Sequence, residues 1–145
     1  MDQDNERTAR PGGLAAWQWA RLFRHIETHL AERITRDQLS SLVYMSTGNF
    51  SRRFKLTTGV SPRQYIARQR AELGRRMLES TREPLSQIAV ACGLCDQAHL
   101  CRLFRRVFGV SPAAWRRARI QAASRAARDQ LRPDCTRLAD PVRHA

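Results

Sequence analysis

The sequence lacks the marks of a membrane, secreted or catalytic protein. No apolar run approaches the roughly 20 residues that a membrane span needs, and the N-terminal residues are too polar for a signal peptide. Its 4 cysteines do not form the spaced framework of a small disulfide-rich domain. Glycine-rich phosphate loops, paired carboxylates and nucleophile motifs are missing. We expect a cytoplasmic protein with reduced thiols that is not an enzyme and uses no cofactor, metal or membrane.

Lysine is nearly absent, and the basic charge is carried by arginine. The 145 residues include 26 Lys and Arg against 13 Asp and Glu, a net charge of +13, and Lys55 is the one lysine. Residues 1–50 and 129–145 are each neutral, so the whole excess falls in residues 51–128. This concentration predicts a polyanionic partner, with nucleic acid ahead of an anionic membrane. The alternative is a solvated basic surface that only aids solubility.

One segment of the chain occurs twice. Residues 50–65 reappear as residues 100–115, at an offset of 50. The matching pairs are Arg52 and Arg102, Phe54 and Phe104, Lys55 and Arg105, Gly59 and Gly109, Ser61 and Ser111, Pro62 and Pro112, and Tyr65 and Trp115. Upstream the offset is 49, which predicts one extra residue between the two helices of the second copy. Two copies are too few for a solenoid and indicate a duplicated module.

Each copy has the pattern of a helix, a tight turn and a second helix. In the first copy, Thr35 begins a helix over 36–43 with a capping box, and Ser46 or Thr47 caps a helix that ends at Gly59. The second copy repeats the pattern, with its turn at Gly93 and its second helix running from about Asp96 to Gly109. No alternation typical of strands occurs.

Two further helices complete the predicted fold. A capping box at Ser61 opens a helix to about Ser80 that joins the copies, with one apolar stripe through Tyr65, Ile66, Gln69, Leu73 and Met77. Its length of roughly 28 Å is close to the ~34 Å between successive major grooves on one face of B-DNA. A helix over about 15–32 is expected to pack Trp17, Ala20, Phe23, Ile26 and Leu30 against the first copy.

The expected fold is therefore all-α, with two helix-turn-helix subdomains, a long linker helix and about seven helices. The expected organisation is a disordered tail over 1–14, a first subdomain over 15–60, the linker over 61–80, a second subdomain over 81–118, and over 119–145 a basic helical extension with a disordered tail.

Several spaced motifs resemble the DNA-binding domain of the AraC/XylS family. They are the run from Phe54 through Gly59 and Ser61-Pro62 to Tyr65, the spacing Arg70, Gly74 and Leu78, the run from Ile88 through Gly93 to Asp96, and the run from Leu100 through Gly109 to Trp115. The resemblance covers about residues 17–118. The sequence departs from the family at Leu94, where the family usually has Phe, at Ser40 and at Gly74, where Ala is common.

The resemblance implies a sequence-specific regulator of transcription that binds double-stranded promoter DNA. Family members mostly activate transcription by contacting RNA polymerase, so an activator with polymerase as a second partner is expected. Only some 15 polar residues precede the first helix, so the chain is similar to the short, stand-alone members, whose activity is set by how much protein is made.

Exposed positions in the first two turns of each second helix are expected to meet base edges. These candidates are Thr47, Asn49, Ser51 and Arg52 in the first copy, and Gln97, His99, Cys101 and Arg102 in the second. Arg52 and Arg102 suit guanine and Gln97 suits adenine, although a phosphate contact or free solvation is the alternative for both arginines. Candidates for phosphate contact are Ser46, Arg53, Lys55, Ser61, Arg63, Arg105, Arg106 and Ser111. Because the two sets differ, we expect an asymmetric site bound by a monomer in successive major grooves.

Two other interpretations of the sequence are open. Cys92 and Cys95 form a CxxC, with His99 and Cys101 nearby, which invites a zinc or redox site. A second pair at proper spacing is missing, so a small core residue beside surface positions is favoured. For the whole protein, the alternative to a promoter-specific regulator is an architectural, nucleoid-associated protein that coats DNA without sequence preference.

Overall fold

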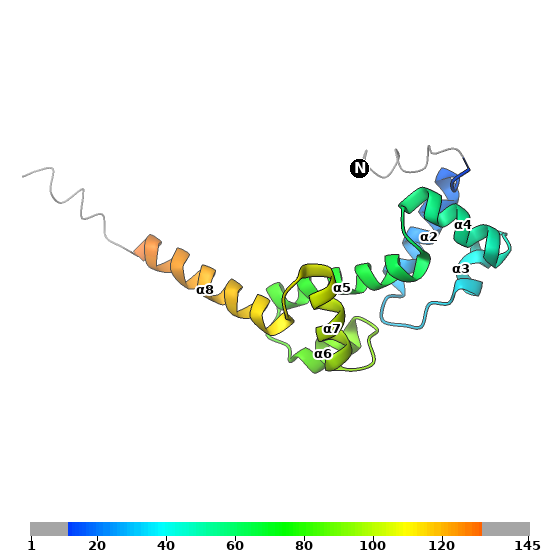
Figure 1. The fold of residues 1–145 in the computed structure, drawn as a ribbon. Coiled ribbons are helices and arrows are strands. Elements are labelled where there is room, and N and C mark those ends of the chain that lie inside the picture. The colour runs from blue at the N-terminus through cyan, green and yellow to red at the C-terminus, as the bar shows by residue number, and fades with distance from the viewer. Residues whose placement is uncertain (1–11, 132–145) are drawn as a thin grey trace, which may run out of the picture.

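The computed structural model describes residues 12–131, and these form seven helices and no strand (Figure 1). The expected all-α fold is thereby confirmed. The helices are α2 (Ala16–Thr28), α3 (Arg36–Leu42), α4 (Thr47–Thr58), α5 (Pro62–Ser80), α6 (Leu85–Ala91), α7 (Gln97–Phe108) and α8 (Pro112–Leu131). The tails predicted to be disordered lie, for residues 1–11 and 132–145, outside the described residues.

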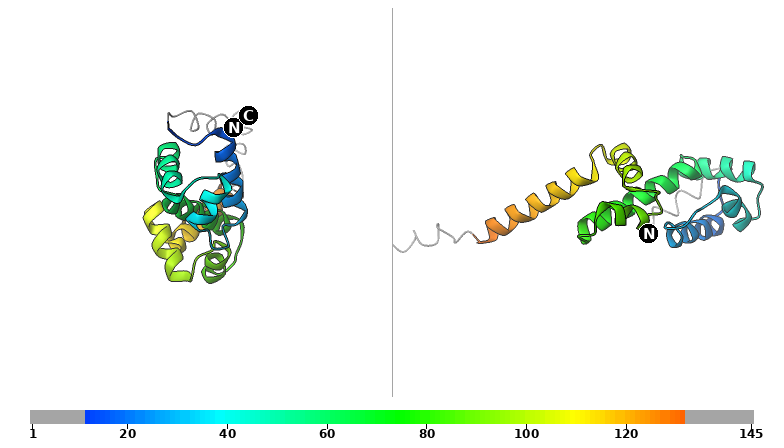
Figure 2. Two further views of the ribbon diagram at one scale, coloured as in Figure 1. Left: turned by 90° about the vertical axis from the view of Figure 1, so that its right-hand side faces the viewer. Right: turned by 90° about the horizontal axis from the view of Figure 1, so that it is seen from below.

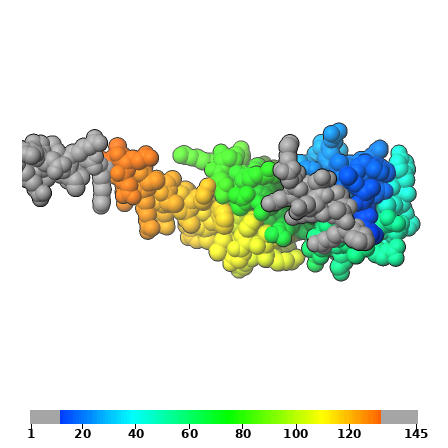
Figure 3. All heavy atoms as spheres, turned by 90° about the horizontal axis from the view of Figure 1, so that it is seen from above, coloured from blue at the N-terminus to red at the C-terminus, as the bar shows by residue number. Residues whose placement is uncertain are grey.

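Helix α5 forms the spine of the molecule. The first unit, α2 to α4, surrounds its N-terminal half, and the second unit, α6 and α7, lies against its C-terminal half (Figure 1). Helix α8 packs on α5 and α7 at its start and then extends away from both units (Figures 1 and 2). The described chain is consequently elongated, with α8 projecting as a rod in the space-filling view (Figure 3).

The predicted caps are present at atomic level. In the capping box of α3, Gln38 N donates to Thr35 Oγ1 at 3.2 Å and Thr35 N donates to Gln38 Oε1 at 3.0 Å. Ser61 and Gln64 make the same pair of bonds at the start of α5, at 3.2 and 3.3 Å. These bonds satisfy backbone N–H groups that a helix start leaves unpaired. Helix α6 differs, because Pro84 is its N-cap and gives no side-chain bond.

Two hydrophobic cores flank α5. The first gathers Trp19, Phe50, Phe54 and Tyr65, with Trp19 to Tyr65 ring centroids 5.5 Å apart in an edge-to-face arrangement. The second core is built from Ile88, Cys92, Leu100, Leu103 and Phe104, and Phe104 stacks edge-to-face on Trp115 at 5.8 Å. Leu73 of α5 packs against both cores, so one helix side chain links the two units.

The prediction for the first helix was wrong in length and for two of its five packing residues, Trp17 and Ala20, whereas Ile26 and Leu30 are buried in the first core and Phe23 packs against it. Helix α2 ends at Thr28 rather than near residue 32, and its buried residues are Trp19, Leu22 and Ile26. Trp17 is 52% exposed and Ala20 is also exposed. Two tryptophans two residues apart make either phase amphipathic, and the aromatic pocket formed by Phe54 and Tyr65 selects Trp19.

The single predicted stripe of the linker is incomplete: Tyr65, Ile66, Leu73 and Met77 do contact a core, but the buried residues of this helix do not lie on one face. Helix α5 buries Tyr65 and Ile66 in the first core, but Ala71, Gly74 and Leu78 toward the second. A helix that passes between two cores must bury two different faces, whereas the prediction assumed one. A Cβ added at Gly74 would lie 3.3 Å from Leu100 Cδ1, so close helix packing explains the glycine.

The extra residue predicted for the second copy is confirmed. Residues 43–46 connect α3 to α4, whereas residues 92–96 connect α6 to α7. Both connections need one left-handed residue, which is Tyr44 at φ 57° in the first unit and Gly93 at φ 77° in the second. A bulky residue in that conformation is uncommon, so the two turns reach the same bend by different chemistry.

Candidate nucleic-acid interface

Helix α4 is the second helix of the first helix-turn-helix. Ser46 caps it, with Ser46 Oγ accepting from Asn49 N at 3.4 Å. Of the predicted base-contacting residues on its first two turns, Arg52 is exposed, whereas Thr47, Asn49 and Ser51 are partly buried. The Ser51 hydroxyl is buried and has no hydrogen-bond partner within residues 12–131. Arg52 is therefore the best placed of these four side chains to reach a partner.

Asn49 positions two arginines of α4. Its side-chain Oδ1 accepts from Arg52 Nη2 at 3.1 Å and from Arg53 Nε at 3.2 Å. These are i,i+3 and i,i+4 contacts on one helix face. The bonds use the amide oxygen of Asn49 and reduce the number of rotamers open to both guanidinium groups. The sequence prediction assigned Asn49 directly to bases and missed this supporting contact.

Helix α7 is the corresponding helix of the second unit. Asp96 caps it through a 2.8 Å bond from His99 N to Asp96 Oδ1. Cys95 N donates to His99 Nδ1 at 3.4 Å, so this histidine folds back toward the turn. Gln97 and Arg102 are exposed, and Cys101 is partly buried. The second unit thus presents an amide and a guanidinium, where the first presents a guanidinium held by an asparagine.

A groove of about 900 Å³ lies between the two units, with α4 on one side and α7 on the other. Six cations line it and no acidic residue does, among the residues that the structure describes. They are Arg33, Arg36, Arg52, Lys55, Arg63 and Arg70. Burial lowers the pKa of the Arg70 guanidinium, which is partly buried on α5. This concentration of like charge in one concave surface favours an anionic ligand.

The groove collects part of the predicted site. Ser51, Arg52, Lys55, Ser61, Arg63 and His99 line it, whereas the other ten predicted residues do not. Those ten are Ser46, Thr47, Asn49, Arg53, Gln97, Cys101, Arg102, Arg105, Arg106 and Ser111. The sequence prediction missed Arg33, Arg36 and Arg70, because only tertiary packing brings the loop after α2 and the start of α3 beside α4 and α5.

Like Ser46, the other two candidate phosphate-contacting serines cap helices. Ser61 accepts from Gln64 N at the start of α5, and Ser111 accepts from Ala114 N at 3.1 Å at the start of α8. Both precede a proline at the first helical position, where a missing N–H costs nothing. The N-termini of α5 and α8 provide positive ends of helix dipoles, and the exposed Arg63 lies in the first turn of α5.

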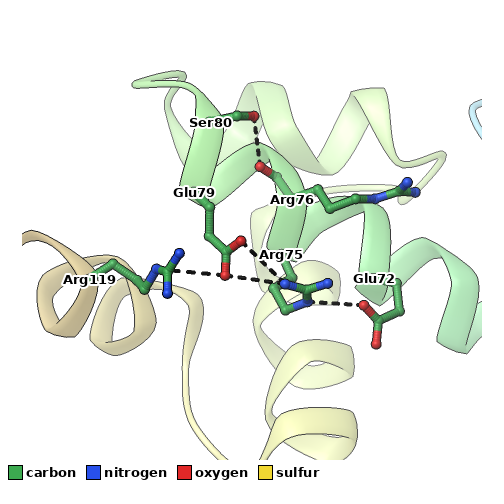
Figure 4. A network of polar contacts seen from close by, with 6 residues as sticks. All are labelled: Glu72, Arg75, Arg76, Glu79, Ser80 and Arg119. Carbon is green, nitrogen blue, oxygen red and sulfur yellow. Dashed lines mark hydrogen bonds and ion pairs between the residues drawn. The ribbon is translucent and has the colours of Figure 1, made fainter. Parts of the chain in front are cut away.

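Arginine is neutralised on a different face of α5. Arg75 Nε donates to Glu72 at 3.0 Å, and Arg75 Nη1 lies 3.2 Å from Glu79 Oε1 (Figure 4). Arg119 of α8 reaches the same Glu79 at 3.7 Å (Figure 4). The hydrogen bond with Glu72 raises the pKa of Arg75 still further. This network fastens α8 to α5 and pairs its charges internally, in contrast to the unpaired cations of the groove.

The cysteines do not form a metal site in the part of the chain that the structure describes, where no cluster of three His, Cys, Asp or Glu side chains occurs. Cys92 is buried in the second core, and burial raises its pKa to about 11. A thiol with such a pKa is protonated near neutral pH and is a poor nucleophile and metal ligand. Cys92 is thus the core residue that the sequence favoured. None of the described helices is long and apolar enough to cross a bilayer.

Residues 39–118 match the family model of a helix-turn-helix domain. The probable transcriptional regulator LumQ of Photobacterium leiognathi is 35% identical over 91 residues, which are 63% of this chain and 37% of LumQ. The transcriptional activator RhaS of Escherichia fergusonii is 31% identical over 119 residues, 82% of this chain and 40% of RhaS. The chain thus spans about two fifths of the length of these curated relatives.

Two solved structures show the same arrangement of helices. The DNA-binding domain of the global transcriptional factor AdpA, in complex with a target DNA, is 36% identical with a TM-score of 0.65, covering 77% of this chain and 96% of that domain. An AraC-type regulator from Chromobacterium violaceum is 26% identical with a TM-score of 0.67, covering 72% and 93%.

Proposed function

This chain belongs to the AraC/XylS family of helix-turn-helix proteins, and on that premise we propose that it is a sequence-specific regulator that binds double-stranded promoter DNA. The observation that carries the proposal is the groove between α4 and α7, which six cations and no acidic residue line among the described residues. A polyanion that enters it meets both helices at once. The AdpA domain, whose fold this chain shares, was solved with target DNA bound.

Sequence would be read by three exposed side chains. Arg52 and Arg102 each offer two parallel N–H donors that match O6 and N7 of guanine, and Gln97 matches N6 and N7 of adenine. Thr47, His99 and Cys101 lie beside them as secondary contacts, and Asn49 acts by holding Arg52. Ser51 drops out of our proposal, because its hydroxyl is buried.

Phosphates would be held by the groove and by the helix starts around it. Lys55 and Arg63 line the groove together with Arg33 and Arg36, and Ser61 marks the N-terminus of α5. We propose Ser46, Arg53, Arg105, Arg106 and Ser111 as further phosphate contacts outside the groove. Such contacts fix register on the duplex but carry little sequence information.

The difference between α4 and α7 implies an asymmetric site. A monomer would bind two unlike half-sites about one helical turn apart, in successive major grooves of one DNA face. Activation through contact with RNA polymerase is proposed from the activators among the relatives. We propose residues 15–60, 61–80 and 81–118 as first subdomain, linker and second subdomain.

The test is a selection of binding sites from random duplex DNA, followed by affinity measurements on the selected site. We expect an asymmetric consensus and at least ~10³-fold tighter binding than to unrelated DNA. Arg52→Ala and Arg102→Ala should each lose about 1–3 kcal/mol and relax the preference at one base pair, in different half-sites.

Two outcomes would count against this function. A specific-to-non-specific ratio near unity would favour the architectural protein that coats DNA. A strictly palindromic consensus would contradict binding by a monomer with two unlike readers. If Arg52→Ala weakened all sequences equally and reduced the salt dependence by about one ion, Arg52 would be a phosphate contact instead.

A further inference from the structure

One contact between the two units centres on a backbone carbonyl, that of Leu30. Leu30, which follows α2, is buried in the first core. Its carbonyl oxygen accepts a hydrogen bond from Arg70 Nε at 3.2 Å, and Arg70 Nη2 donates to Glu32 O at 2.9 Å. One guanidinium of the linker helix therefore holds the segment that leads out of α2. Because both acceptors are backbone atoms, the contact depends on chain position rather than on a particular side chain.

Gly93 of the second unit packs closely against the same carbonyl. A Cβ placed on Gly93 would lie 2.1 Å from Leu30 O and 3.2 Å from the carbonyl carbon of Ala31. Gly59 and Gly109 have nearly the same φ, 83° and 79°, yet a Cβ on either meets nothing within 4 Å. Left-handed geometry alone does not produce the contact at Gly93. The turn of the second helix-turn-helix is in backbone contact with the first unit.

Neighbouring side chains make this joint, formed by Leu30, Arg70 and Gly93, stiff. Leu94 follows Gly93 and is 5% exposed, in the second core. Leu73, one turn of α5 beyond Arg70, packs on both cores. A rotation of one unit against the other would break both hydrogen bonds and expose apolar surface on each side. Packed interfaces resist such continuous deformation.

We propose that Arg70 and Gly93 fix the separation and angle between α4 and α7, and thereby determine which spacing between half-sites the protein accepts. The inference rests on the proposed function, since it assigns the spacing of the same two-part site. One added base pair moves a half-site by roughly 3.4 Å and turns it by roughly 35° around the DNA axis. A stiff joint cannot follow that movement, whereas a loosened joint can. In this role Arg70 is a positioning residue that does not itself need to touch DNA.

The experiment uses the full chain and the DNA site recovered by selection, re-synthesised with one base pair inserted or removed between the half-sites. For the wild type we expect the altered spacings to weaken binding on the order of tenfold or more, as loss of one reader would. Arg70→Ala should reduce this penalty to about threefold or less. Arg70→Lys, which keeps the charge but not the two-pronged contact, should behave like Arg70→Ala.

Arg68→Ala is the matched control. It removes the same charge from an exposed position of the same helix that makes no hydrogen bond or ion pair with the first unit among the described residues, and it should keep the wild-type spacing penalty. If Arg70→Ala instead weakened all three spacings equally, lowered the salt slope by about one ion and were rescued by Arg70→Lys, Arg70 would be a phosphate contact and the inference would be wrong.

The same data separate this inference from the proposed function. A wild-type protein without preference for any sequence contradicts the proposed function itself. A wild type that selects sequence and spacing, with Arg70→Ala equally strict about spacing, contradicts only the role of the joint. Circular dichroism of each variant establishes that the helices are intact before binding is compared.

Discussion

The two units share a framework and differ in how they present their reading side chains. At equivalent positions, Asn49 of the first unit holds Arg52, whereas His99 of the second accepts a bond from the turn and leaves Arg102 unpartnered among residues 12–131. Their turns differ too, with Tyr44 in one and Gly93 in the other. Repetition of the cap and core residues preserves the scaffold, while the exposed positions are free to diverge.

The largest test of this comparison concerns the equivalent core residues Phe54 and Phe104, which are both fully buried. Either change to Ala should cost about 3–5 kcal/mol, from lost burial and the cavity left behind. If α5 and Leu73 couple the units, each variant should show one unfolding transition shifted as a whole. Urea unfolding followed by circular dichroism and by tryptophan fluorescence measures this. Two separate transitions would show that the units fold independently.

The turn glycines provide the next test. Gly109→Ala should lower the free energy of unfolding by about 1–2 kcal/mol, because alanine is strained in the left-handed backbone conformation. Gly93→Ala adds the collision with Leu30 O and should reach about 3 kcal/mol, because backbone atoms must move apart. Denaturant unfolding of both variants compares them. Equal losses would mean that the two units do not press on each other at Gly93.

Removing a helix cap should cost a different amount of stability in each unit, and the difference should be smaller than for the turn glycines. Asp96 receives a 2.8 Å bond from His99 N, while Ser46 receives one of 3.4 Å from Asn49 N. We expect Asp96→Ala to cost about 1–2 kcal/mol and Ser46→Ala about 0.5–1 kcal/mol, since the carboxylate also favours the helix dipole. Thermal unfolding at low and high salt checks both, and the difference should shrink in high salt.

The smallest effect is expected where Asn49 supports Arg52. Asn49→Ala should weaken binding two- to fivefold, because ordering a freed arginine costs roughly 0.5–1 kcal/mol. The loss should fall on the base pair that Arg52 reads. His99→Ala should leave the base preference assigned to Arg102 unchanged. If both variants altered their neighbouring arginine alike, the difference between the units would lie elsewhere.

Local order along the chain was predictable from the sequence. Thr35 with Gln38 and Ser61 with Gln64 have the spacing of capping boxes, and Gly59 and Gly109 have the position of helix terminators, because these features depend on a few adjacent residues. The hydrogen bonds from Arg52 and Arg53 to Asn49 could also have been predicted from the sequence, since side chains three and four residues apart share a helix face.

Contacts between distant segments were beyond such reasoning. The phase of α2 depended on which tryptophan entered a pocket built by Phe54 and Tyr65, and the sequence offered both. Arg70 donates its hydrogen bonds to backbone carbonyls. Every residue has a carbonyl, so the sequence does not indicate which one is the acceptor. For the same reason Arg33 and Arg36 were missed as groove residues.

Leu73, packed on both cores, has a consequence for affinity. Once one unit of a two-part binder is docked, the other is confined near its own half-site, and its local concentration replaces its concentration in solution. A continuous helix between the units makes that local concentration high at the matching spacing and close to zero elsewhere. Two recognition helices that each bind weakly can then form a tight complex. A poor base match under either helix lowers the affinity of the whole complex.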